Sequence, residues 1–368
     1  MGNREQVEVR DPFLITYSLF PKIMKIFSTH KKLIKFIYIA IIFLVAIGLA
    51  FVWQRMMEPD AVREVQLETN FASVKEPIKP IPLEIKLNEQ KVVLGKKLFD
   101  DKSLSGDGKV SCASCHNLQM GGVDRKRLSE GVNGQLTAVN TLTVFNSGLN
   151  FRLNWNGEYK NLYDHLDEPL VGSRVMGSSW PAILEVIGNS SEYVRDFSSI
   201  YADGVTRENI KDALATYEMS LITPNSPFDR FLLGDTNAIT EEEKQGYQIF
   251  KNYGCISCHQ GVNVGGNLFQ KIGILGDYFR DRGNITQADL GRFNITGEES
   301  DRYVFRVPSL RNVELTPPYF HDGFAETIED AIEAMAKYQL GRPLSEEQVN
   351  LIVKFLKTLT GEYRGQSL

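Results

Sequence analysis

The four cysteines of this 368-residue chain all lie in two copies of one short pattern. "CASCH" runs from Cys112 to His116, and "CISCH" runs from Cys255 to His259. In C-x-x-C-H, the two thiols can add to the vinyl groups of a haem, and the adjacent histidine can bind its iron from one face. A zinc or thiol redox site would need no histidine at that position. The pattern therefore predicts two covalently bound haem c groups, attached at Cys112, Cys115, Cys255 and Cys258, with His116 and His259 as axial ligands.

Each haem iron has a second axial position, and its occupant separates electron transfer from ligand chemistry. Met335 is the only methionine after residue 226, and it shares a helical apolar period with Ile328, Ala331 and Ile332. A thioether ligand would suit the second haem, but the same pattern is typical of a methionine packed in a core. The spacing alone leaves both interpretations open.

The segments that must position these residues are predicted to be mainly helical. Capping patterns begin at Thr240, Thr327 and Ser345, each ahead of an apolar helical period, and no convincing alternating strand pattern is present. "LGKKLF" (94–99) and "QGYQIF" (245–250) form a weak internal repeat, a glycine-containing helix that leads into a haem site. We therefore expect a mainly α fold with two cytochrome c-like haem domains, at residues 84–225 and 226–368.

The N-terminal part predicts a membrane anchor. Residues 36–53 contain no charge, and a helix of that length spans roughly 27 Å, close to the thickness of a bilayer core. Five lysines between residues 22 and 35 precede it, so the positive-inside rule predicts a cytoplasmic segment at residues 1–35 and a periplasmic location for the haem domains. A cleaved signal peptide is the alternative, but "GLAFVWQRM" offers no A-x-A-like site. We expect an uncleaved transmembrane helix in the inner membrane and a proline-containing linker at residues 54–83.

Charge also bears on the partners. Beyond residue 55 the chain has 33 basic and 43 acidic residues. A surface with this excess of acidic residues would attract a basic redox partner, although the same charge also simply keeps a protein soluble. Nucleic acid is not an expected partner.

Four stretches of the chain resemble a known family over about residues 70–362: "LGKKLFDDKSLSGDGKVSCASCHNLQMGG", "NWNGEYKNL", "GCISCHQGVNVGG" and "VFRVPSLRNVELTPPYFHDGFAETIEDAIEAMAKYQL". They are similar to the bacterial di-haem cytochrome c peroxidases, relatives of the MauG enzymes. The resemblance implies an enzyme that reduces hydrogen peroxide to water with electrons from a small periplasmic donor, such as a cytochrome c. A homodimer is compatible with this interpretation.

The same resemblance implies roles for individual residues. The haem on His259 and Met335 would receive electrons, and the haem on His116 would bind peroxide. Trp155 would relay electrons between them. A calcium ion would be held at the domain interface by Asn140, Thr316 and Pro318, for which an ordinary interface turn is the alternative.

The chain departs from the family pattern around the first haem. Val132 stands where family members carry a histidine that ligates the oxidised haem, Val175 stands at the distal glutamate, and Asn154 replaces an aromatic residue. His165 stands at the family's pocket glutamine. A histidine with an ordinary pKa near 6.5 suits a proton shuttle. We consider His165 as the distal acid and base, with a sixth iron ligand and a surface bystander as alternatives.

Two other functions therefore stay open. The chain could be a membrane-tethered electron carrier or ligand binder that lacks peroxidase activity, or a MauG-like protein that oxidises another protein.

Overall fold

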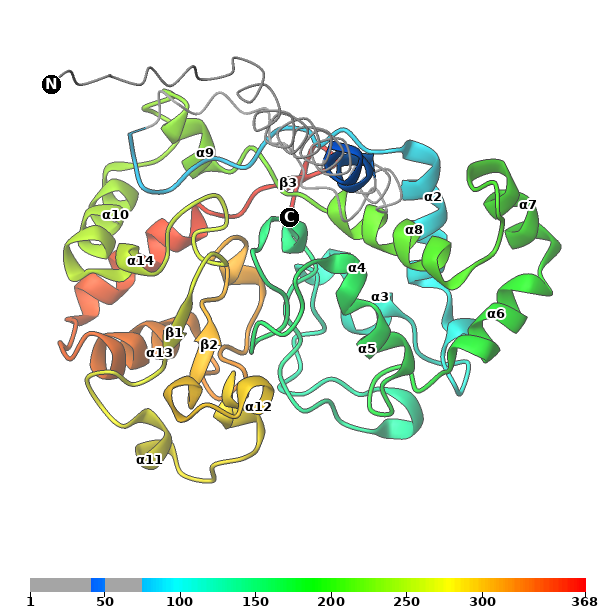
Figure 1. Ribbon diagram of the computed structural model, residues 1–368. Coiled ribbons are helices and arrows are strands. Elements are labelled where there is room, and N and C mark those ends of the chain that lie inside the picture. Colours follow the sequence, from blue (N-terminus) through cyan, green and yellow to red (C-terminus); the bar gives the residue numbers. More distant parts are fainter. Residues whose placement is uncertain (1–40, 50–74) are drawn as a thin grey trace, which may run out of the picture. The chain divides into compact units, whose positions relative to one another are not determined.

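The computed structural model describes residues 41–49 and 75–368, and Figure 1 shows their arrangement. The chain divides into two compact units, Met1–Glu58 and Pro59–Leu368. Residues 41–49 are helical and exposed. Within the described ranges no helix combines the length and apolar character needed to cross a bilayer. Half of the predicted anchor at residues 36–53 lies outside these ranges, as do all of residues 1–35 and most of the predicted linker.

The second unit is mainly helical, as the sequence predicts. Its α-helices are α2 (Glu89–Asp100), α3 (Cys112–Cys115), α4 (Leu162–His165), α5 (Asp167–Val171), α6 (Trp180–Gly188), α7 (Ser191–Ile200), α8 (Arg207–Met219), α9 (Pro227–Leu232), α10 (Glu241–Tyr253), α11 (Tyr278–Arg282), α12 (Phe293–Thr296), α13 (Ile328–Ala334) and α14 (Glu346–Lys357). The three predicted capping patterns are confirmed, because Thr240, Thr327 and Ser345 cap the N-termini of α10, α13 and α14.

Four very short strands are also present, and the sequence did not predict them. β1 (Phe269–Lys271) pairs antiparallel with β2 (Val304–Arg306), with Phe269 opposite Arg306, and β3 (Glu362–Tyr363) pairs antiparallel with β4 (Gln366–Ser367). Strands of two or three residues are too short to show the alternation of side chains that identifies a strand in a sequence.

Two helix pairs form the frame of the unit (Figure 1): α2 packs against α8, and α10 packs against α14. Each pair is in contact at a glycine. A Cβ atom added to Gly95 would lie 2.0 Å from the carbonyl oxygen of Ala213, and one added to Gly246 would lie 1.9 Å from that of Leu351. These two glycines belong to the two copies of the internal repeat, so the repeat corresponds to one helix crossing that is used twice.

Replacing Gly95 by alanine is therefore expected to destabilise the protein. Alanine normally favours a helix by about 1 kcal/mol over glycine, but here the methyl group must push α2 away from the backbone of α8, and overpacking typically costs about 1–3 kcal/mol. Gly188→Ala is the matched control, because this α6 residue has open space around the added Cβ. Thermal unfolding of both variants measures the difference. Equal melting temperatures would contradict the close crossing.

Three buried apolar clusters lie in the described part of this unit. The first is formed by residues between Leu94 and Leu221, and the second by Ile78 together with residues between Phe228 and Leu359. The third and smallest is formed by Trp155, Tyr278, Phe279 and Phe305. The C-terminal segment packs back on the first cluster through Tyr363. The predicted linker is extended at its end, but it is not a free tether there, because Ile78 is fully buried and forms a bridge with Gly261.

Candidate functional site

The first C-x-x-C-H motif lies on the short helix α3, which His116 ends. The backbone N–H of His116 donates to the Cys112 carbonyl at 2.9 Å, and its Nδ1 lies 3.2 Å from the Gly122 carbonyl oxygen. A carbonyl partner fixes the proton on Nδ1 and leaves Nε2 with a free lone pair. The ring is therefore oriented and set in the tautomer that a metal ligand requires.

The second motif repeats this arrangement on a 3₁₀ turn, Cys255–Ser257. The backbone N–H of His259 donates to the Cys255 carbonyl at 3.0 Å, and its Nδ1 lies 3.2 Å from the Val264 carbonyl oxygen. Burial lowers the pKa of His116 and lowers that of His259 to about 4. Both imidazoles are thus neutral at pH 7, which is the form that binds iron.

The four thiols are free, and none is paired in a disulfide. In each motif the aromatic residue of the internal repeat lies near the histidine: the ring centroids are 6.5 Å apart for Phe99 and His116, and 6.3 Å apart for Phe250 and His259. Two thiols, an oriented neutral imidazole and an aromatic neighbour form a donor set that fits a covalently held haem at both motifs.

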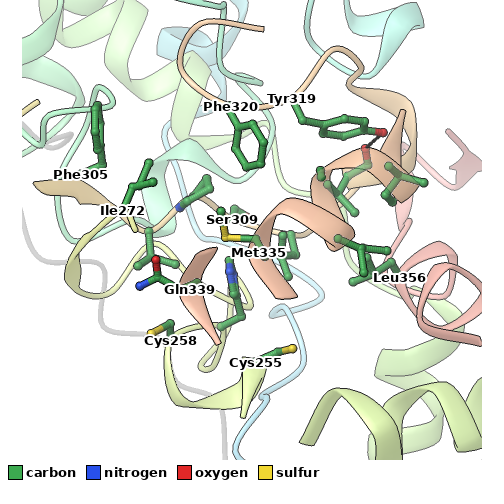
Figure 2. A pocket seen from close by; sticks show the side chains of 18 of the residues that line it. Cys255, Cys258, Ile272, Phe305, Ser309, Tyr319, Phe320, Met335, Gln339 and Leu356 are labelled. Carbon is green, nitrogen blue, oxygen red and sulfur yellow. Dashed lines mark hydrogen bonds between the residues drawn. The ribbon is translucent and has the colours of Figure 1, made fainter. Parts of the chain in front are cut away.

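A large, mostly apolar cavity lies at the second motif. Cys255, Cys258, His259 and Met335 all line it, and Figure 2 shows the labelled cysteines and Met335 around the same space. Met335 is partly exposed and belongs to none of the buried apolar clusters of the described residues. It begins a π-helical turn, Met335–Gln339, directly after α13. Such turns are frequent at functional sites. The geometry favours a ligand role for Met335 over core packing.

Trp155 lines the same cavity and is buried. Its indole Nε1 donates to the Asn140 carbonyl at 2.8 Å. Residues 140–143 also line this cavity, and the backbone of Leu142 interacts with the His116 imidazole of the first motif. This segment therefore borders both candidate haem sites, and Trp155 is joined to it by the hydrogen bond to Asn140.

The three residues that the sequence suggests for calcium all line this cavity: Asn140, Thr316 and Pro318. The side-chain Nδ2 of Asn140 donates to the Lys126 carbonyl at 3.0 Å and to the Arg127 carbonyl at 3.3 Å. A hard cation prefers carbonyl and amide oxygens. Because the amide nitrogen faces these two carbonyls, calcium at this site stays a prediction.

A buried charged cluster beside Trp155 was not found from the sequence. His321 Nε2 lies 2.6 Å from Asp289, and Arg282 pairs with Asp289 and with Asp322. Burial alone would raise the pKa of Asp289, but hydrogen bonds from His321 and Arg282 hold it well below its usual range. Because Arg282 pairs with both carboxylates and His321 lies against Asp289, we interpret the cluster as an ion-pair network. In the sequence, His321 and Asp322 of this cluster lie in "FHDG", which contributes only to the family resemblance.

His165 is the last residue of α4, and its ring lies edge-on to Tyr159 with centroids 5.2 Å apart. Its pKa is lowered to about 4 by burial and by repulsion between its protonated form and that of His116, so it lies below the ordinary value near 6.5 that the sequence interpretation assumed. The side chain is partly buried, and the interaction with His116 brings it to the first haem site. This position argues against a surface bystander.

Two of the departures from the family pattern are neighbours in the structure. The backbone N–H of Val132 donates to the Val175 carbonyl at 2.7 Å, and Val132 is buried against Gly177. Neither valine can ligate iron or carry a proton. Asn154, the third departure, has a left-handed backbone with φ of 67°. Its carbonyl accepts a hydrogen bond from Arg306 Nε at 3.1 Å.

Comparisons with known proteins agree with these features. Residues 89–237 match the model of the family described as di-haem cytochrome c peroxidase. The cytochrome c551 peroxidase of Nitrosomonas europaea is 42% identical over 291 residues, which cover 79% of this chain and 86% of that protein. The chain belongs to the di-haem cytochrome c peroxidase family. The resemblance seen in the sequence is thereby confirmed.

Two further similarities bear on the function. The cytochrome c peroxidase Ccp of Escherichia coli strain K12 is 44% identical over 78% of this chain, and the match spans 62% of that longer protein. The crystal structure of a MauG-like protein associated with microbial copper homeostasis superposes with a TM-score of 0.68 at 28% identity, over 78% of this chain and 94% of that one. This family member therefore has close counterparts named as peroxidases and a structural counterpart named as MauG-like.

Proposed function

We propose that this chain is a cytochrome c peroxidase that reduces hydrogen peroxide to water with electrons from a small redox donor, such as a periplasmic cytochrome c. The observation that carries the proposal is the pair of C-x-x-C-H sites, with the segment 140–143 bordering both and a buried tryptophan hydrogen-bonded to that segment. The 42% identical relative named cytochrome c551 peroxidase supports it. Steady-state turnover of hydrogen peroxide with a reduced cytochrome c or an artificial donor tests it directly.

In this proposal the chain's residues divide the work. Cys112 and Cys115 would hold one haem with His116 as a ligand, and the second C-x-x-C pair would hold the other with His259 and Met335 as ligands. Bound haem supplies the redox-active iron that the reaction needs. Trp155, whose indole is fixed by its hydrogen bond to Asn140, lies where electrons pass from the second site to the first.

His165 supplies the proton transfer. Reduction of peroxide needs a group that takes a proton from one oxygen and delivers it to the departing one. The lowered pKa of His165 keeps its imidazole neutral at pH 7, so a ring nitrogen can accept that proton. No carboxylate stands at position 175 to do this instead.

Three finer features belong to the same proposal. A calcium ion would be held by Asn140, Thr316 and Pro318 and would fix the wall that carries Trp155. Residues 36–53 would anchor the protein in the inner membrane, with the haem sites in the periplasm. The support is the uncharged run and the lysines that precede it.

A second candidate function is MauG-like oxidation of another protein, or electron carriage without peroxidase activity. The specific observation in its favour is the pair of valines, Val132 and Val175, in contact at the first site. The 28% identical MauG-like structure adds weight. Peroxide turnover near zero in the haem-loaded protein would favour this candidate over the peroxidase.

The absence of a switching histidine leads to a prediction about activation. Because Val132 cannot ligate iron, the oxidised first haem is expected to be high-spin, and the protein should react with peroxide without prior reduction. Electron paramagnetic resonance and absorption spectra of the fully oxidised protein, before and after peroxide, measure both. A low-spin, bis-histidine first haem would contradict the prediction and would make His165 an iron ligand.

A further inference from the structure

Glu218 is a buried carboxyl group that no step of the proposed reaction uses. It is the penultimate residue of α8 and is 8% exposed. Among the residues that the structure describes, no group donates a hydrogen bond to its side chain and no cation pairs with it. Lys211 on the same helix is buried too, but it pairs with Asp167 at 2.5 Å. A buried acid without a partner is costly, so Glu218 needs an explanation.

The crossing of α2 with α8 resembles that of α10 with α14, and comparing the two shows where Glu218 lies. Gly95 meets Tyr217 on α8, and Gly246 meets Phe355 on α14, each through the Cβ atom of the aromatic residue. The next residues along these helices, Glu218 and Leu356, therefore hold corresponding positions. The ring contacts Phe99 with Tyr217 and Phe250 with Phe355 have centroid distances of 5.2 Å in both pairs, which supports this register.

Leu356 identifies the surroundings. It lines the cavity that Cys255, His259 and Met335 share (Figure 2). Glu218 accordingly holds, at the first motif, the position that an apolar side chain holds at the second. An independent observation agrees, because the charge of Glu218 helps to raise the pKa of the Cys112 thiol.

The ionisable groups on the elements around α8 do not neutralise Glu218. On α2, Lys97 pairs with Glu192 and Asp196, Lys91 pairs with Asp212 of α8, and Asp100 carries the same sign of charge as Glu218. Cys112 on α3, Tyr163 and His165 on α4, and Tyr363 and Arg364 near the C-terminus are the other titratable or charged neighbours of this region. Arg364 acts on Tyr217, but it is not among the causes of the shifted pKa of Glu218. Burial is the one cause of the raised pKa of Glu218, about 8, so the group can change its protonation near neutral pH.

We infer that Glu218 is a proton-linked carboxyl of the first haem site, which binds one proton from solvent when that haem accepts one electron and releases it on oxidation. The inference rests on the haem proposed at His116. An oxidised haem carries one more positive charge than a reduced one, so it favours the carboxylate, and reduction favours the acid. No bond other than that to the proton forms or breaks. Glu218 then stores, beside the site, a proton of the kind that peroxide reduction consumes.

The sign of the pH effect follows. At low pH Glu218 is neutral in both redox states, and at high pH it is ionised in both, so the potential is flat in these ranges. Between the pKa of Glu218 with the first haem oxidised and its pKa with that haem reduced, the midpoint potential of the first haem should fall by about 59 mV per pH unit. This is the one-electron equivalent of a tenfold change in proton concentration.

Spectroelectrochemical titration of the haem-loaded protein between about pH 5 and pH 9, with each haem followed by its own spectrum, tests the inference. The sloping region should be present for the first haem of the wild type and lost in Glu218→Gln, which keeps the size of the side chain. Glu218→Leu, which copies the second site, should lose it as well and serves if the glutamine variant does not load haem. Leu356→Glu should create a slope at the second haem.

A first-haem slope that survives in both Glu218 variants would overturn the inference. So would a slope that is absent from the wild type, or one that is lost in His165→Gln and kept in Glu218→Gln. Haem content, measured separately, distinguishes this failure from failure of the proposed function, because a wild-type protein without haem at Cys112 would overturn the function itself.

Discussion

Replacing His165 by alanine is expected to lower peroxide turnover by about 10²- to 10⁴-fold, the usual contribution of a general acid and base. The reason is the composition of the first site. The side chain of Val175 offers no proton acceptor, and the imidazole of His165 is neutral at pH 7 because burial and the nearby His116 lower its pKa. Haem content should not change, since His165 lies outside both attachment motifs. Steady-state assays with an artificial donor measure the effect.

Two further variants separate proton transfer from simple positioning. His165→Gln keeps hydrogen-bonding capacity but cannot shuttle a proton, so it should be nearly as slow as His165→Ala. Adding Val175→Glu to either variant should recover part of the loss, because the reaction needs a suitably placed base rather than imidazole itself. Full activity in His165→Ala would mean that another group or a water molecule moves the proton.

The attachment sites could be predicted from the sequence because their chemistry is local. Two cysteines and a histidine within five residues contain the whole donor set, and the structure adds only the carbonyls of Gly122 and Val264 that orient the rings. The helices α10, α13 and α14 were predictable for the same reason, since a capping residue and its partner are three positions apart.

Features that depend on distant residues could not be predicted. His321 lies 32 positions from Asp289, and no local pattern indicates their pairing. Glu218 looks like an ordinary helical acid in the sequence. Its role emerges only when the crossing of α2 with α8 is compared with that of α10 with α14, and this comparison requires the Gly95 and Gly246 contacts. The contact between Val132 and Val175 likewise joins segments about 40 residues apart, as their numbers show.

Met335 is an intermediate case. An apolar residue at helical spacing is typical of both a core position and a ligand on one face of a helix. In the structure α13 gives way to a π-helical turn at this residue and the side chain borders the cavity of His259, which supports the proposed ligand role. Local propensity does not encode a π-turn, which is why the sequence left two alternatives.

Replacing Met335 by leucine is expected to lower the potential of the second haem by more than about 59 mV, so the equilibrium constant for electron entry falls more than about tenfold. Leucine has nearly the same volume as methionine but no sulfur, and such an exchange in a core usually costs less than about 1.5 kcal/mol. A packing role therefore predicts an almost unchanged spectrum and potential, whereas a ligand role predicts loss of the thioether coordination and slow turnover with the protein donor.

Met335→His offers the converse control, since an imidazole at this position should restore a low-spin haem at a lower potential than the thioether gives. Peroxide binding at the first haem should be unaffected in both variants, because Met335 lines the cavity at His259. Redox titration and the low-spin signal of the second haem decide between the two roles, and an unchanged potential in Met335→Leu would leave Met335 as a packing residue.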